Sequence, residues 1–165
     1  MAIIPKCGVI TGCVALGMVL IPIEAHAENQ YLTAVTSEVF LATGTPKELA
    51  TRASTCISQI LAPGTVDAQL IISSDLDGGV VVARNALESG GVARQKIRGR
   101  FTFEARDGRF RIEQTNLEAF SSVLKRWASI GKWAGSGWKK AEAAFASSAT
   151  EVANCVIGGP RRDDW

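Results

Sequence analysis

Two alternating stretches around an Asp107-Gly108 pair constrain the fold of this chain more than any other feature of its sequence. Between Ile97 and Leu117, apolar and charged residues alternate on both sides of the pair. Two-residue hairpin turns prefer Asp-Gly, so we predict a β-hairpin in which Arg106 faces Arg109. The predicted pairs are Ala105 with Phe110, Phe103 with Ile112 and Phe101 with Gln114 on one face, and Glu104 with Arg111, Thr102 with Glu113 and Arg100 with Thr115 on the other.

The apolar face of this hairpin determines its register. A shift of one residue would move Phe101, Phe103, Phe110 and Ile112 into water, at a cost of roughly 1.5–3 kcal/mol for each large side chain. We therefore expect these side chains to lie beneath helices and the neighbouring arginines to point away from them.

The start of the chain has the pattern of a secretory signal peptide. Lys6 precedes an apolar run over residues 14–21, which is too short to span a bilayer, and the small-residue pattern Ala25-His26-Ala27 follows. We predict a signal peptide over residues 1–27, cleaved between Ala27 and Glu28, and a periplasmic or secreted mature protein.

Two alternatives to a signal peptide fit this segment less well. A buried strand or helix would leave the Ala-x-Ala pattern unexplained. A lipoprotein anchored at Cys13 would have only three residues between Lys6 and Ile10 as the apolar core of its signal peptide. Its mature protein would then begin with the apolar residues from Val14 onward.

Cleavage after Ala27 removes the chemistry that many enzymes need. His26 is the only histidine, so the remaining 138 residues lack Ser-His and Cys-His pairs and any histidine-containing metal site. Lys6 and Glu24 leave together, so the net charge stays at +2, which argues against a general polyanion binder. We expect a non-enzymatic protein with no catalytic residues, metal or cofactor. The alternative is a hydrolase that uses carboxylates, for which the candidates are Glu104, Glu113 and Glu118.

Two cysteines, Cys56 and Cys155, remain in the mature chain. An even pair in an exported protein favours a disulfide. The alternative is that both are small buried apolar side chains, as cysteine often is.

The rest of the chain predicts a single domain over residues 37–157, between a flexible leader at 28–36 and a polar tail at 158–165. Thr45, Pro46 and Glu48 form a capping box with proline at the first helical position. The expected elements are a strand at 37–42, a helix from Pro46 to about Leu61, strands at 68–74 and 79–85, and a fourth strand that starts near Arg94 and leads into the hairpin.

From Glu118 to Val156 the apolar residues recur at mostly three- and four-residue steps. This spacing predicts one long amphipathic helix or two helices that share a stripe, with a kink or loop near Gly131, Gly135 and Gly137. Trp127, Trp133 and Trp138 fall among lysines on this stretch. They therefore either pack in the core or make a peripheral membrane contact.

A set of cap, turn and hairpin motifs extends over much of the chain. It comprises Phe40, Thr45–Leu49 with Arg52 and Ala53, Asp75–Gly79, the hairpin from Phe101 to Ile112, and Asp163–Trp165. In these residues the chain resembles a bacterial family that is known only as a domain of unknown function with a TATA-binding-protein-like (TBP-like) fold. The resemblance implies an α+β fold, in which a curved antiparallel sheet carries an N-terminal helix and a long C-terminal amphipathic helix on one face. It also implies export, as in many members of the family, and it supplies no catalytic residues.

The arginines of the hairpin are the candidate ligand-binding residues. Guanidinium groups suit carboxylate and phosphate partners, so we expect an uncharacterised module of the bacterial envelope that binds a protein or an anionic component through the open sheet face. The alternative is a solvated face with Glu104–Arg111 pairing. Nucleic acid is excluded as a partner, because an exported protein does not meet the genome and the hairpin places no aromatic residue among the arginines. The candidates are Arg98, Arg100, Arg109 and Arg111.

Overall fold

The computed structural model describes residues 30–64, 69–90 and 94–160. The predicted signal peptide with its cleavage site at Ala27 and Glu28, the alternative anchor Cys13, and residues 161–165 of the predicted tail lie outside this part.

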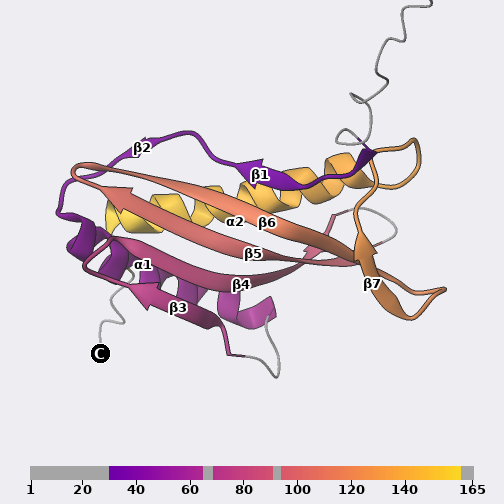
Figure 1. Ribbon diagram of the computed structural model, residues 1–165, viewed down its shortest axis with the longest axis horizontal. Coiled ribbons are helices and arrows are strands. Elements are labelled where there is room, and N and C mark those ends of the chain that lie inside the picture. The colour runs from indigo at the N-terminus through magenta and orange to yellow at the C-terminus, as the bar shows by residue number, and fades with distance from the viewer. Residues whose placement is uncertain (1–29, 65–68, 91–93, 161–165) are drawn as a thin grey trace, which may run out of the picture.

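The described residues form an α+β fold, with a seven-stranded antiparallel sheet and two α-helices that lie on the same side of it (Figure 1). The sheet order is β1-β6-β5-β4-β3, and β2 and β7 also pair with β6. This confirms the predicted fold class. The elements are β1 (Ala34–Thr36), β2 (Phe40–Leu41), α1 (Pro46–Leu61), the 3-10 helix η2 (Ala62–Gly64), β3 (Ile71–Asp75), β4 (Val80–Ser89), β5 (Gln95–Arg106), β6 (Arg109–Ser121), β7 (Arg126–Ser129) and α2 (Trp138–Gly158).

The hairpin of β5 and β6 has the predicted register at every predicted pair, from Arg106 opposite Arg109 to Arg100 opposite Thr115. Gly108 occupies the turn with a φ of 69°, a conformation that glycine adopts without strain. The register shifts between Arg98 and Arg100, where the backbone of Gly99 comes close to the Leu117 side chain.

The helices cover the apolar face of this hairpin, as predicted. Phe101, Phe103 and Ile112 are fully buried, together with Leu49 of α1 and Val152 of α2. A second cluster surrounds Phe145 nearer the start of α2. Burial of the aromatic rings therefore determines which face of the sheet receives the helices.

The predicted capping box at the start of α1 is present. The Glu48 amide donates to Thr45 Oγ1 at 3.3 Å, and the Thr45 amide donates to Glu48 Oε2 at 2.8 Å. The hydrogen bond from the Thr45 backbone lowers the pKa of the Glu48 carboxyl, because it stabilises the ionised form.

The prediction of a flexible leader over residues 28–36 is wrong for its described part. Residues 34–36 form β1, which pairs with β6, and Leu32 is buried in the second cluster. The hydrogen bonds that order this segment come from the edge of β6, almost 80 residues further along the chain, and no local pattern marks them.

The prediction of helix from Glu118 onward is also wrong up to residue 137. β6 continues to Ser121, a turn follows, and β7 returns antiparallel with Trp127 opposite Phe120. A spacing of seven residues fits two turns of a helix and also the two arms of a short hairpin, so the pattern alone does not separate them. Gly135 and Gly137 have φ angles of 86° and 76°, which end any helix there, and α2 begins at Trp138.

A buried polar network joins the sheet to α2, and the sequence did not indicate it. Asn85 Nδ2 donates to Gln114 Oε1 at 2.6 Å and to Ser148 Oγ at 2.8 Å. Gln114 Nε2 in turn donates to the Phe145 carbonyl at 2.6 Å. These bonds fix the position of α2 along the sheet, because a shift of the helix would leave these buried amide groups without their partners.

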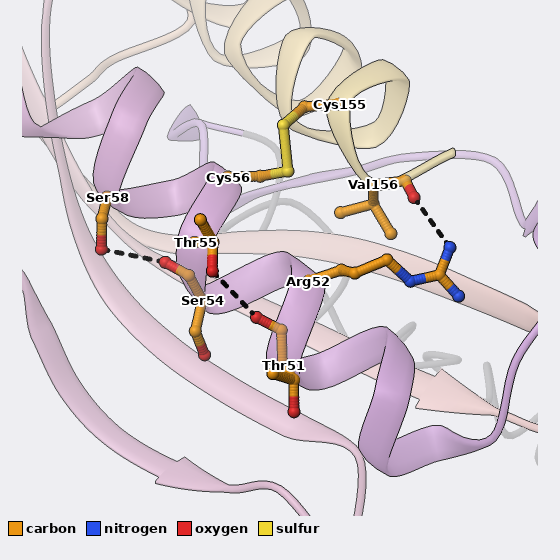
Figure 2. Close-up of a disulfide and its surroundings, with 8 residues drawn as sticks. All are labelled: Thr51, Arg52, Ser54, Thr55, Cys56, Ser58, Cys155 and Val156. Carbon is orange, nitrogen blue, oxygen red and sulfur yellow. Dashed lines mark hydrogen bonds between the residues drawn. A yellow bond between two sulfur atoms is a disulfide. The ribbon is translucent and has the colours of Figure 1, made fainter. Parts of the chain in front are cut away.

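The predicted disulfide joins Cys56 of α1 to Cys155 of α2, with Cα atoms 5.8 Å apart (Figure 2). Beside it, the Arg52 guanidinium donates to the Val156 carbonyl at 3.3 Å. The two helices are therefore connected by a covalent bond and by a hydrogen bond near the end of α2.

Removing the disulfide tests how much it stabilises the fold. The double substitution C56A/C155A should lower the free energy of unfolding by about 4–5 kcal/mol, because the bond closes a loop of about 100 residues in the unfolded chain. Denaturant titration with and without a thiol reductant measures this effect. Identical transitions under the two conditions would contradict the bond.

The network at Asn85 gives a second prediction. Asn85→Ala should lower the free energy of unfolding by about 1–3 kcal/mol, because Gln114 Oε1 loses its donor in a buried site. The same substitution at the exposed Asn154 of α2 is the matched control and should change it by less than about 0.5 kcal/mol. Equal effects of the two substitutions in urea titration would show that the network contributes nothing.

Candidate functional site

The sheet face turned away from the helices, here called the open face, is rich in arginine. Along β5 and β6 buried residues alternate with exposed or half-buried ones, so the charged positions share this face. Figure 1 shows β4, β5 and β6 side by side across it. Its basic residues include Arg84 of β4, Lys96, Arg98 and Arg100 of β5, and Arg109 and Arg111 of β6.

Arg111 and Arg106 share one carboxylate at the turn end of the hairpin. Arg111 donates to Glu104 Oε2 through Nε at 3.0 Å and Nη2 at 2.8 Å, and Arg106 donates to Glu104 Oε1 at 3.3 Å. The bond from Arg111, and then that from Arg106, lower the pKa of the Glu104 carboxyl. The predicted Glu104–Arg111 pair is therefore present, and it already occupies the Arg111 guanidinium.

Arg98 is held in place from two sides. Its Nε and Nη2 both lie 2.7 Å from Glu118 Oε2, and its guanidinium carbon lies 4.3 Å from the centre of the Trp127 ring. Phe120 meets the same ring edge-on at 5.5 Å. The charge of Arg98 is thus balanced within the protein.

Arg100 has a different environment, because Arg84 of β4 lies directly opposite it. On its other side Arg100 faces Thr115. Within the described ranges neither arginine forms an ion pair with a carboxylate. Like charges in directly opposite positions tend to destabilise a sheet.

Sequence reasoning missed Arg84. The alternation Val80, Val82, Arg84 along its strand indicates that these residues share a face, but only the pairing of β4 with β5 shows that Arg84 meets Arg100. A register that depends on a partner strand is not visible in either segment alone.

Arg109 lies beside the hairpin turn, apart from Arg100. In the described part of the chain it forms no ion pair. It lines an open hollow of about 180 Å³ together with Val39, Phe110, and Glu104 with its two arginines, Arg106 and Arg111. Arg111 and Thr115, the partner of Arg100, are four residues apart on β6, which is about 13 Å along a strand. The structure therefore separates Arg109 and Arg111, near the hairpin turn, from Arg98 and Arg100, which lie further along β5.

Two of the three tryptophans predicted on the C-terminal helix lie outside it. Trp127 is in β7, Trp133 is in the segment before α2, and Trp138 is the first residue of α2, so one helix does not carry all three. Trp127 and Phe120 lie on the open face beside Arg98, which corrects the expectation that no aromatic residue is found among the arginines. Of the two reasons given against nucleic acid as a partner, only the expected export of the protein remains.

The three carboxylates considered for hydrolysis do not gather into one site. Glu104 and Glu118 bind arginines, and Glu113 lies opposite Thr102. A general acid needs a raised pKa, whereas that of Glu104 is lowered.

Within residues 30–64, 69–90 and 94–160, no three histidine, cysteine or acidic side chains gather closely enough to hold a metal ion. The helices in these ranges include none that has both the length and the apolar character to cross a membrane.

Comparison with known proteins identifies the fold. No family model matches the sequence, and no curated protein matches it. A DUF4468 family protein from Bacteroides ovatus matches with a TM-score of 0.57 at 12% identity, over 79% of this chain and 89% of that one. A TBP-like protein from Parabacteroides distasonis matches with a TM-score of 0.51 at 15% identity, over 73% and 92%. These likenesses show the TBP-like fold and fit the resemblance seen in the sequence.

The paired carboxylate gives a prediction with a defined pH dependence. Glu104→Gln should lower the free energy of unfolding at pH 7 by less than about 1 kcal/mol, because the pair is partly exposed. The folded pKa is lowered, so this contribution is present above the ordinary glutamate pKa of about 4.3 and disappears as the pH falls through the folded value.

Thermal unfolding of the parent and the variant between pH 7 and pH 3 measures the difference. The exposed Glu38, which forms no ion pair within the described ranges, is the control, and Glu38→Gln should change the melting temperature at pH 7 less than Glu104→Gln does. A Glu104→Gln difference that grows as the pH falls would contradict the assigned direction.

Proposed function

We propose that this protein is an exported, non-enzymatic binding module, and that its open face takes a partner that carries carboxylate or phosphate groups. The observation that carries the proposal is the Arg84–Arg100 pair. Two cations held opposite each other destabilise the free protein, and an oxyanion between them would remove that repulsion.

The surroundings of this pair favour a localised site over a general attraction for anions. Arg98 and Arg111 are both neutralised by glutamates, and the whole chain carries a net charge of only +2. Thr115 lies beside Arg100 and supplies a hydroxyl that can donate to an oxyanion. The arrangement therefore offers two guanidinium forks and a hydroxyl at one place on the sheet.

Three features support a partner in the bacterial envelope. The sequence has the Ala25-x-Ala27 pattern of a cleaved signal peptide, and the Cys56–Cys155 disulfide fits an oxidising compartment. The Bacteroides ovatus and Parabacteroides distasonis proteins of similar fold are both bacterial. The proposed partner is thus another exported protein with an acidic surface, or an anionic component of the envelope.

Substituting the unpaired arginines tests the proposal. R84Q/R100Q should weaken binding of a hexaglutamate peptide or of pyrophosphate by about 10–100-fold, because two charge-assisted contacts are lost. The same variant should be as stable as the parent or slightly more stable, because the repulsion between the arginines is gone. Titration calorimetry and thermal unfolding measure the two effects.

Arg111→Gln is the matched control, because it removes one arginine of the same face that already binds Glu104. It should retain most of the binding and lose a little stability. Binding by the parent should weaken as salt is added. Equal losses of binding in the two variants, or no binding of either probe by the parent, would refute a site at Arg84 and Arg100.

A further inference from the structure

The turn between β6 and β7 exposes two adjacent aliphatic side chains. Val123 is 87% exposed and Leu124 is 59% exposed. The turn extends beyond the ends of the neighbouring strands β4 and β5 (Figure 1). Single exposed apolar residues are common on protein surfaces, but an adjacent pair at a projecting tip presents a continuous apolar surface to the medium.

The tip has a defined turn geometry and does not fold back onto the protein. The Leu124 amide donates to Ser121 Oγ at 3.1 Å, and Lys125 closes the turn in a left-handed conformation with a φ of 51°. Below the turn, Phe120 pairs with Trp127 and their rings meet edge-on. This packing fixes the direction of the hairpin, so that Val123 and Leu124 remain at its end.

Basic residues follow this apolar tip in the sequence and line a hollow beside the turn. Lys125 and Arg126 are exposed and follow it directly. An open hollow of about 650 Å³ adjoins the turn at Ser121 and Ser122, and its described lining includes Arg94, Lys96 and Lys140 but no acidic residue. Of these five basic residues, only Arg94 forms an ion pair within the described ranges, at 3.8 Å from Glu88.

We infer that this end of the molecule docks on a lipid bilayer that contains anionic headgroups. Val123 and Leu124 enter the boundary between headgroups and acyl chains, and the surrounding lysines and arginines contact lipid phosphates.

The shape of the tip favours a bilayer over a protein as its occupant. Protein contacts draw their binding energy from aromatic and arginine anchors in well-packed pockets, whereas this surface is a convex aliphatic point. A fluid bilayer receives such a point without a preformed pocket. The inference uses residues other than the Arg84–Arg100 pair and goes beyond the function proposed for the open face.

Vesicle sedimentation tests this docking surface with the full-length protein as recovered from expressing cells. The parent should bind vesicles of phosphatidylcholine with one third phosphatidylglycerol more tightly than vesicles of phosphatidylcholine alone. V123S/L124S should weaken binding to the mixed vesicles by at least about tenfold, because the inserted aliphatic surface is lost. K125Q/R126Q should weaken it by about fivefold for each charge, and only for the anionic vesicles.

V39S/L41S is the matched control. It removes two exposed aliphatic residues at and beside β2, at the opposite end of the sheet, and should bind as the parent does. All three variants change exposed side chains, so their melting temperatures should equal that of the parent. Equal vesicle binding by V123S/L124S and V39S/L41S would overturn the inference, and so would loss of a protein partner by V123S/L124S with vesicle binding unchanged.

The two proposals fail independently. In the R84Q/R100Q background, vesicle binding should still fall by about tenfold on adding V123S/L124S, and binding of the hexaglutamate peptide should be unaffected by V123S/L124S alone. A tip that has no effect in that background would overturn the bilayer inference and leave the open-face site intact.

Discussion

Burial of the aromatic face of the β5–β6 hairpin is the constraint on which the rest of the structure depends. Phe101, Phe103 and Phe110 are almost completely excluded from water, and the side chains of α1 and α2 complete their surroundings. Because successive residues of a strand point to opposite faces, burying these rings turns the intervening arginines outward. The basic character of the open face is therefore a direct consequence of how the core is packed.

The length of β6 organises the outer half of the sheet. Its thirteen residues pair with β5 on one side and, on the other, with β2, β1 and β7 in turn along its length. Three short strands thus obtain their hydrogen bonds from one long strand. In return they cover the edge of β6, which would otherwise be available for pairing with other chains. The same extension of β6 carries the β6–β7 turn beyond the sheet and so creates the exposed tip.

Pairing between strands separates the arginines that are used internally from those that are not. Arg98 and Arg111 lie opposite glutamates and form ion pairs, whereas Arg100 lies between Arg84 and a threonine. The proposed functions follow this division. One concerns the unpaired arginines on the open face, and the other concerns the cations around an apolar tip, so the molecule would offer one surface to a partner and another to a membrane.

Local signals in the sequence determined the elements that depend on few residues. Asp107-Gly108 and its alternating arms predicted the hairpin with its register, and Thr45 to Glu48 predicted the start of α1. The even pair of cysteines favoured a disulfide, but only the packing of α1 against α2 brings these two distant residues together. Only the tertiary structure decided the remaining elements. β1 exists because β6 offers an edge, residues 118–129 form two strands because they pair with each other, and Asn85 is buried because Gln114 and Ser148 bind its amide. The physical reason is that β1 and Asn85 bind segments far apart in the chain, and that the spacing within residues 118–129 fits a helix as well as a short hairpin, whereas turn and capping preferences act within a few residues.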